Sequence, residues 1–160
     1  MGERFLALPW GRLLRREAGQ LRGTRKDQHK VAVVIEDDDV TRELLATLLQ
    51  EEGFKAVTVA DGNQALQIIE RLQPDLVTLD LSLPGKGGAE ILMELWERRL
   101  SKTVPVIVVS ATTAHLPLNV RALAHSVVDK PFNLDDLLRA VDRAIGDGHR
   151  KVRVPQHRPA

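Results

Sequence analysis

Short apolar runs alternate with amphipathic segments from Val31 onward. The runs cover 31–35, 56–59, 75–79, 104–109 and 126–129. The runs at 31–35, 75–79 and 104–109 are nearly free of charge, as expected for buried strands, whereas 56–59 has mixed faces and 126–129 is short. The segments between them place apolar residues three and four positions apart, as on one face of a helix. They cover 40–49, 65–72, 89–96, a short stretch from about 117, and 134–145. Strands that alternate with helices predict a parallel sheet covered by helices on both faces.

Local signals mark where these helices begin and end. Asp61, followed by Gln64 three residues later, resembles a capping box, and Asn133 is a capping residue for the last helix. Either Asp38 or Asp39 is expected to cap the first helix. Gly53 is expected to end the first helix, and Gly146 with Gly148 the last.

In such a sheet, ligands bind beyond the carboxyl ends of the strands. The first strand ends in the acidic run 36–39, the third in Asp80, the fourth in Ser110, and the fifth in Asp129 and Lys130. Each has an ordinary alternative: a solvated acidic turn, a turn-starting Asp, a Ser at a strand end, or a surface lysine. Because all of these residues fall at one edge of the sheet, we expect them to form a ligand-binding site.

The residue types define the chemistry of that site. Clustered carboxylates such as Glu36, Asp37 and Asp80 suit Mg²⁺, which takes oxygen ligands. A hydroxyl at Ser110 and an ammonium at Lys130 suit the oxygens of a phosphoryl group. The acidic run also argues against a phosphate-binding glycine loop after the first strand. A carboxylate, a divalent cation and a lysine are what an aspartyl-phosphate site needs.

The net charge of +1 conceals a division into three parts. Residues 31–146 carry a net charge of −7, residues 1–30 carry +5, and residues 147–160 carry +3. We therefore expect one acidic domain at 31–146, a loosely ordered basic extension before it and a basic tail after it. The 160-residue chain has no cysteine and no apolar run long enough to span a membrane. These features favour a cytoplasmic protein.

Four motifs in this order resemble the receiver domain of two-component response regulators: VVIEDD at 33–38, PDLVTLDLSLPG at 74–85, VIVVSA at 106–111 and DKPF at 129–132. The resemblance covers 31–146. It implies a doubly wound, flavodoxin-like (βα)5 fold with a five-stranded parallel sheet in the order 2-1-3-4-5.

The resemblance also implies roles for individual residues. Asp80 would be the phosphoacceptor, and Mg²⁺ would be held by Glu36, Asp37, Asp80 and the backbone carbonyl of Ser82. Ser110 would be the switch hydroxyl, Lys130 would contact the phosphoryl oxygens, and Pro131 would follow a cis peptide bond.

The chain departs from the family pattern in three places. Val127 occupies the position of the usual aromatic switch residue, and Gly87 replaces a common acid in the turn after Asp80. The usual Gly-Ala pair before the fifth strand is missing, and the stretch from Ala122 to Lys130 is about two residues short. These departures affect the expected signalling face and leave the acidic pocket intact.

The functional expectation is a response regulator of a two-component phosphorelay, not an enzyme apart from self-catalysed phosphorylation and dephosphorylation. Its phosphodonor would be a sensor histidine kinase or a histidine phosphotransfer protein. The short segment after Gly146 suggests a stand-alone receiver that signals to another protein and binds no specific nucleic acid. A weak homodimer through the fourth helix, fifth strand and last helix is a further expectation.

Two other protein classes remain as alternatives. A Mg²⁺-dependent haloacid-dehalogenase-like phosphatase would also use Asp80, but it normally has a second Asp where this chain has Ser82. A flavodoxin-like binding module would need a loop rich in glycine and hydroxyl groups where this chain has 36–39.

Overall fold

The computed structural model describes residues 29–148. Most of the predicted basic extension at 1–30 and of the predicted basic tail at 147–160 lies outside the described residues; at their inner ends, Lys30 belongs to the first strand and residues 147–148 to the last helix. The centre of the fold is one parallel sheet with the strand order β2-β1-β3-β4-β5, as predicted. Its strands are β1 (Lys30–Ile35), β2 (Phe54–Val59), β3 (Leu76–Leu79), β4 (Val106–Ser110) and β5 (Ser126–Asp129).

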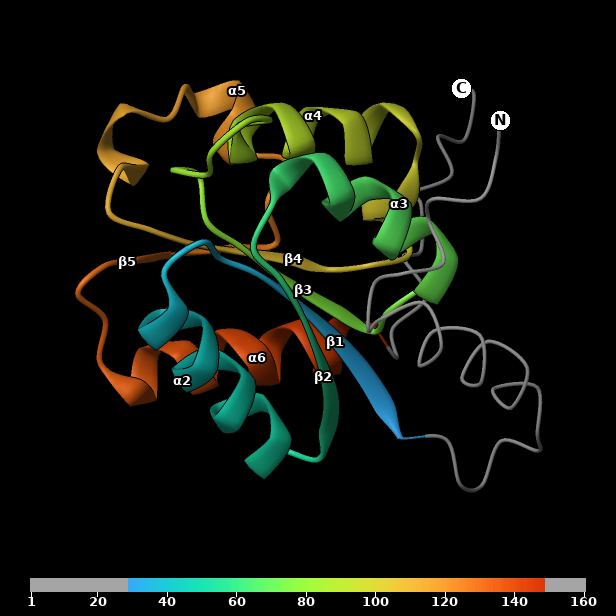
Figure 1. Ribbon diagram of the computed structural model, residues 1–160, viewed down its shortest axis with the longest axis vertical. Coiled ribbons are helices and arrows are strands. Elements are labelled where there is room, and N and C mark those ends of the chain that lie inside the picture. The colour runs from blue at the N-terminus through green and yellow to red at the C-terminus, as the bar shows by residue number, and fades with distance from the viewer. Residues whose placement is uncertain (1–28, 149–160) are drawn as a thin grey trace, which may run out of the picture.

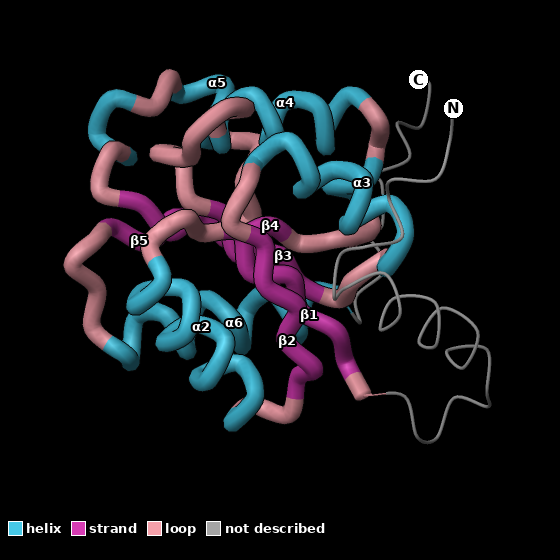
Figure 2. Tube along the Cα trace, in the orientation of Figure 1, coloured by secondary structure: helices cyan, strands magenta, loops and turns pink. Residues whose placement is uncertain are grey.

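Helices cover both faces of the sheet (Figures 1 and 2). One face carries α2 (Asp39–Glu51) and α6 (Leu134–Gly148). The other carries α3 (Gly62–Leu72), α4 (Gly88–Glu97) and the short α5 (Leu118–Arg121). Two 3-10 turns, η2 (Leu100–Lys102) and η3 (Thr113–His115), flank β4. This is the three-layer arrangement that the alternating pattern predicts.

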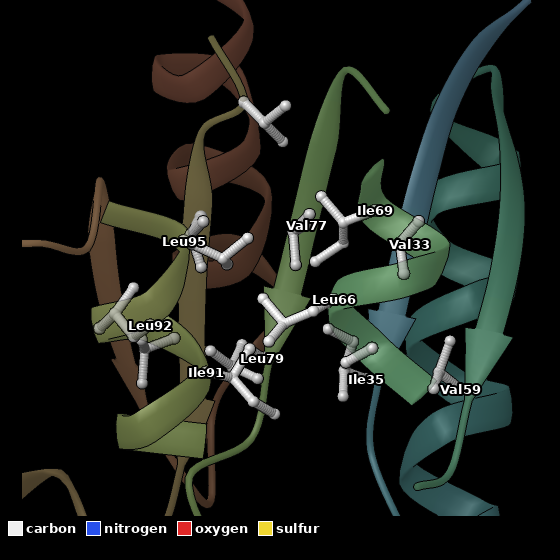
Figure 3. Packing of buried hydrophobic residues seen from close by; sticks show 14 of the residues in the cluster. Val33, Ile35, Val59, Leu66, Ile69, Val77, Leu79, Ile91, Leu92 and Leu95 are labelled. Carbon is white, nitrogen blue, oxygen red and sulfur yellow. The ribbon is translucent and has the colours of Figure 1, made fainter. Parts of the chain in front are cut away.

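Alternation along each strand divides the apolar core into two clusters. In Figure 3, residues from β1, β2 and β3 pack against α3 and α4; the labelled side chains are Val33, Ile35, Val59, Leu66, Ile69, Val77, Leu79, Ile91, Leu92 and Leu95. The opposite cluster joins the other strand faces to α2 and α6 through residues such as Val34, Leu45, Ile107, Leu137 and Val141. Burial on both faces explains why the central strands β1, β3 and β4 are almost entirely apolar, whereas the edge strands β2 and β5 are only partly buried and include polar residues.

The helix caps agree with the sequence in most places. Asp38 caps α2 by accepting from the Thr41 N–H at 2.8 Å, Asp61 accepts from Asn63 N–H at 2.9 Å, and Asn133 accepts from Asp136 N–H at 2.8 Å. Each cap is at the carboxyl edge of the sheet. They fix where the strand-end loops turn into helices.

Two strands begin two residues away from their predicted starts. The fourth strand begins at Val106 and not at Val104, because Pro105 between them has no N–H to donate. The second strand begins at Phe54, two residues earlier than predicted. The last helix α6 ends at Gly148, and Gly146, the other glycine expected at its end, lies inside it. Val141 and Ala144 keep this helix packed on the core, and that packing offsets the roughly 1 kcal/mol that an internal glycine costs.

Within 29–148, none of the helices combines the length and the apolar character needed to cross a membrane.

Candidate functional site

The strand register places the predicted site residues along one edge of the sheet. Ile35 pairs with Leu79, so Glu36 and Asp80 follow at neighbouring strand ends, and the Asp80 N–H donates to the Ile35 carbonyl at 3.0 Å. On the other side of β3, Ser110 at the end of β4 pairs with Asp129 at the end of β5. The central strands thus bring together residues that are far apart in the sequence.

Three carboxylates form the floor and rim of the site. Glu36, Asp37 and Asp80 each offer an oxygen, and these atoms all lie within 4.8 Å of one another. Glu36 and Asp80 are almost fully buried, with 1% and 4% of their surface exposed, whereas Asp37 is exposed. Two buried carboxylates and one exposed carboxylate supply hard oxygen donors with an open side toward solvent. This donor set fits Mg²⁺, which keeps several of its own waters.

Lys130 offsets part of this negative charge. Its Nζ lies 2.6 Å from Glu36 Oε2 and 3.4 Å from Asp80 Oδ2. Burial raises the pKa of the Glu36 carboxyl, opposed by the hydrogen bond from Lys130 and reinforced by the charge of Asp80. Burial acts to lower the pKa of Lys130, but its hydrogen bond to Glu36 and the nearby carboxylates outweigh burial and raise it. The ammonium therefore stays charged between the two buried acids.

The backbone around Lys130 follows the prediction from the sequence. The Lys130–Pro131 peptide bond is cis, and the Lys130 N–H donates to the Ser110 carbonyl at 3.0 Å. The neighbouring Asp129 accepts a hydrogen bond from the Thr113 hydroxyl. The end of β5 is thus tied to the loop that follows β4.

Ser110 is fully buried, and its hydroxyl contacts a second hydroxyl that the sequence did not single out. Ser110 Oγ lies 3.2 Å from Thr112 Oγ1, which in turn lies 3.3 Å from Ser82 Oγ. The Ser82 N–H donates to Asp80 Oδ1 at 3.2 Å. These contacts link the loops after β3 and β4 across the site. Metal binding by the Ser82 carbonyl stays a prediction.

Arg42 is another residue that the sequence reasoning missed. It lies in the first turn of α2, and its guanidinium contacts the loop that carries Glu36 and Asp37. Its position three residues after Asp39 is the spacing of an ion pair on one helix face, which was the signal available in the sequence.

The two substituted family positions lie away from the carboxylates. Val127 in β5 pairs with Val108 and packs, partly buried, against the cluster between the sheet and α3 to α5. Gly87 is the residue before α4, and a Cβ there would meet no atom within 4 Å. By contrast, a Cβ on Gly88 would meet the Asp80 carbonyl oxygen at 2.1 Å, so the next position accepts only glycine.

Comparison with known proteins identifies the family. The family model of the response regulator receiver domain matches residues 32–142. The chain belongs to this family. Its membership confirms the resemblance drawn from the four motifs and sets aside the phosphatase and flavodoxin alternatives.

Curated relatives share this region only. The chain is 36% identical over 111 residues to the DNA-binding response regulator MtrA of Mycolicibacterium smegmatis, covering 68% of this chain and 47% of that protein. It is 37% identical over 120 residues to the sensory transduction protein RegX3 of Mycobacterium bovis, covering 72% of this chain and 52% of that protein. The chain thus spans about half the length of the curated relatives it matches.

Solved structures show the same fold. The response regulator TrrA of Thermotoga maritima, in complex with Mg²⁺-BeF, is 32% identical with a TM-score of 0.66, covering 72% of this chain and 98% of that chain. A CheY-like receiver domain of Methylobacillus flagellatus is 26% identical with a TM-score of 0.66, covering 73% of this chain and 99% of that chain. The chain is therefore a receiver domain of two-component signalling with the flavodoxin-like fold.

Proposed function

We propose that Asp80 accepts a phosphoryl group from a phosphohistidine on a sensor histidine kinase or histidine phosphotransfer protein. The observation that carries this proposal is the position of the Asp80 carboxylate. It ends the central strand β3, lies within 4.8 Å of two further carboxylates and has the Lys130 ammonium 3.4 Å away. Few structural tasks need three acids and a lysine converging at the carboxyl edge of a parallel sheet.

The transfer requires a nucleophile and compensation for charge. A carboxylate oxygen of Asp80 attacks phosphorus, an O–P bond forms, the P–N bond to the donor histidine breaks, and the imidazole keeps the electron pair. Lys130 is already charged and adjacent, so it can move from Glu36 toward the new phosphoryl oxygens. Ser110, on the next strand, is the hydroxyl available to follow.

Glu36, Asp37 and Asp80 would hold Mg²⁺, with the Ser82 carbonyl as the remaining protein ligand. When bound, the ion would shield these carboxylates from the incoming anion and offset the charge that develops on it. Before Mg²⁺ binds, the charged Lys130 would offset part of the negative charge of Glu36 and Asp80.

The remaining expectations belong to the same proposal. The domain acts as a phosphoacceptor and catalyses no reaction on another substrate, beyond self-catalysed phosphorylation and dephosphorylation. It signals from the cytoplasm through protein contacts of its phosphorylated state. DNA binding appears in the name of MtrA, a protein of about twice the matched length. For the present chain we propose a protein target.

The test is labelling by acetyl phosphate with Mg²⁺, read by intact mass. Wild-type protein should gain one phosphoryl group, and Asp80→Asn should gain none while its circular dichroism spectrum stays unchanged. Asp61→Asn is the matched control, because Asp61 also follows a strand at this edge and Asn retains its capping role. Full labelling of Asp80→Asn would refute the assignment.

A further inference from the structure

Arg42 ties together the backbone that carries two of the three carboxylates. Its Nη1 donates to the carbonyl oxygens of Glu36 and Asp37, each at 3.0 Å, and its Nη2 pairs with the Asp39 carboxylate. The Arg42 side chain is 20% exposed, so much of its surface packs against the protein. One planar guanidinium thus spans the loop between β1 and α2, using the several donors that distinguish arginine from lysine.

The inner side of the same loop is held separately. Glu36 Oε1 accepts from the Asp38 N–H at 3.2 Å, and the Glu36 N–H donates to the Val59 carbonyl at 3.0 Å. The carbonyls that Arg42 contacts belong to the two peptide units that directly follow the Cα atoms of Glu36 and Asp37. Fixing these carbonyls restricts rotation of those peptide units, and with it the direction of both side chains toward Asp80.

We propose that Arg42 is a positioning residue of the cation site, which holds the loop so that Glu36 and Asp37 converge on Asp80. The inference deepens the proposed function, since it rests on those carboxylates binding Mg²⁺. Arg42 itself contacts neither the ion nor the phosphoryl group.

The positive charge of Arg42 allows its role in positioning the loop to be distinguished from a direct electrostatic effect on Mg²⁺ affinity. A cation beside a Mg²⁺ site repels the ion, so removing its charge alone would strengthen Mg²⁺ binding. Loss of loop order acts in the opposite direction, because the carboxylates must then be organised at the expense of binding free energy. Positioning and charge therefore predict affinity changes of opposite sign.

The experiment compares Mg²⁺ binding by isothermal titration calorimetry at low ionic strength in wild type, Arg42→Gln and Arg42→Lys. Gln suits a helix about as well as Arg does. We expect Arg42→Gln to weaken Mg²⁺ binding roughly ten-fold, the low end of the loss caused by removing an outer-sphere partner of a metal site. Arg42→Lys should also bind weakly, because a shorter side chain with a single nitrogen retains the charge but cannot hold both carbonyls and the Asp39 carboxylate at once in the planar geometry of the guanidinium.

Arg71→Gln is the matched control, since it makes the same charge change in the last turn of α3, at the opposite edge of the sheet. It should leave Mg²⁺ affinity within about two-fold of wild type, because exposed charges are screened over that distance. Amide hydrogen exchange without metal gives a second readout. Residues 36–39 should exchange faster in Arg42→Gln than in Arg71→Gln.

Unchanged or tighter Mg²⁺ binding in Arg42→Gln would overturn the proposal, and so would full recovery in Arg42→Lys. Failure of the proposed function has a different appearance. If the proposed function fails, wild-type protein is not labelled at Asp80. If only the present inference fails, wild-type protein is labelled, but the Arg42 variants do not show weaker Mg²⁺ binding.

Discussion

Two buried threonines near the site differ in whether the side-chain hydroxyl has a hydrogen-bond partner among the described residues. Thr78, two residues before Asp80 in β3, is 1% exposed, and its hydroxyl has no hydrogen-bond partner within the described part of the chain. Thr113, in the turn after β4, is 4% exposed and donates to Asp129. A buried hydroxyl without a partner destabilises the fold, whereas a paired one costs stability when it is removed. The same substitution at the two positions should therefore have opposite effects.

We expect Thr78→Val to raise the free energy of unfolding by about 1 kcal/mol, because a methyl group replaces a desolvated hydroxyl of similar size. Thr113→Val should lower it by about 1 kcal/mol, because the hydrogen bond to Asp129 is lost while water can solvate the exposed carboxylate. Urea unfolding of both variants measures the two values. A loss of stability in Thr78→Val as large as that in Thr113→Val would show that the Thr78 hydroxyl is satisfied in solution.

At the scale of elements, an ion-pair network connects the loop after Asp80 to two helices. Lys86 in that loop pairs with Glu94 of α4, and Arg98 at the end of α4 contacts Glu94 at 3.0 Å and also pairs with Glu70 of α3. The hydrogen bond from Lys86, opposed by desolvation and aided by the charges of Lys86 and Arg98, lowers the pKa of Glu94. The loop after Asp80 is therefore anchored through Glu94.

Glu94→Gln should lower the melting temperature at neutral pH, and the difference from wild type should shrink in acid. The pKa of Glu94 in the folded state lies below its ordinary value of 4.5, so its contribution is present above about pH 4.5 and is lost as the pH falls through the folded value. Thermal unfolding from neutral pH to pH ~3 at low and high salt measures this. The effect should be small and weaker in salt, as for exposed pairs. A difference independent of pH would contradict the ionic explanation.

At the scale of the whole molecule, the chain departs most from the family pattern in the residues that connect the site with the face formed by α5, β5 and α6. Val127 is β-branched and packed against the core, so this position has no ring that could move between buried and exposed positions if Ser110 moved as the resemblance implies. The remaining connections run through the 110–117 loop, where Thr112 and Thr113 link Ser110, Ser82 and Asp129. Loss of one differential interaction reduces how far phosphorylation can shift this face.

We expect the coupling between Asp80 and residues 112–145 to be below about 1 kcal/mol, under the usual 1–3 kcal/mol for allosteric pairs. Amide hydrogen exchange with and without beryllofluoride and Mg²⁺ measures it, with the segment around Asp80 as internal reference. Val127→Tyr restores an aromatic side chain and should enlarge the change. Protection changes across 112–145 in the wild type as large as those beside Asp80 would show that the valine does not limit read-out.

Local patterns in the sequence were sufficient for the alternation of strands and helices and for grouping the candidate site residues, whereas the strand order followed from the resemblance to the receiver family. Apolar runs identify the central strands buried on both faces, and parallel strands must gather their carboxyl ends at one edge. Glu36, Asp37, Asp80, Ser110 and Lys130 could therefore be grouped before any coordinates were known. The boundary error at Val104 arose because Pro105 has no N–H to donate to a neighbouring strand, an effect that depends on strand pairing.

Only the tertiary structure decided how these residues are paired. The Lys130 ammonium lies closer to the carboxylate of Glu36, which is 94 residues earlier in the sequence, than to the carboxylate of Asp80. Strand register and burial set these two distances. The tertiary structure also leaves the Thr78 hydroxyl without a hydrogen-bond partner among residues 29–148, whereas the Thr113 hydroxyl meets Asp129. Asp38 caps α2 while Asp39 pairs with Arg42, a division between identical side chains that depends on which way each one points from the turn. Residue types determine which chemical groups the site can contain, and the distances between remote segments determine which of these groups interact.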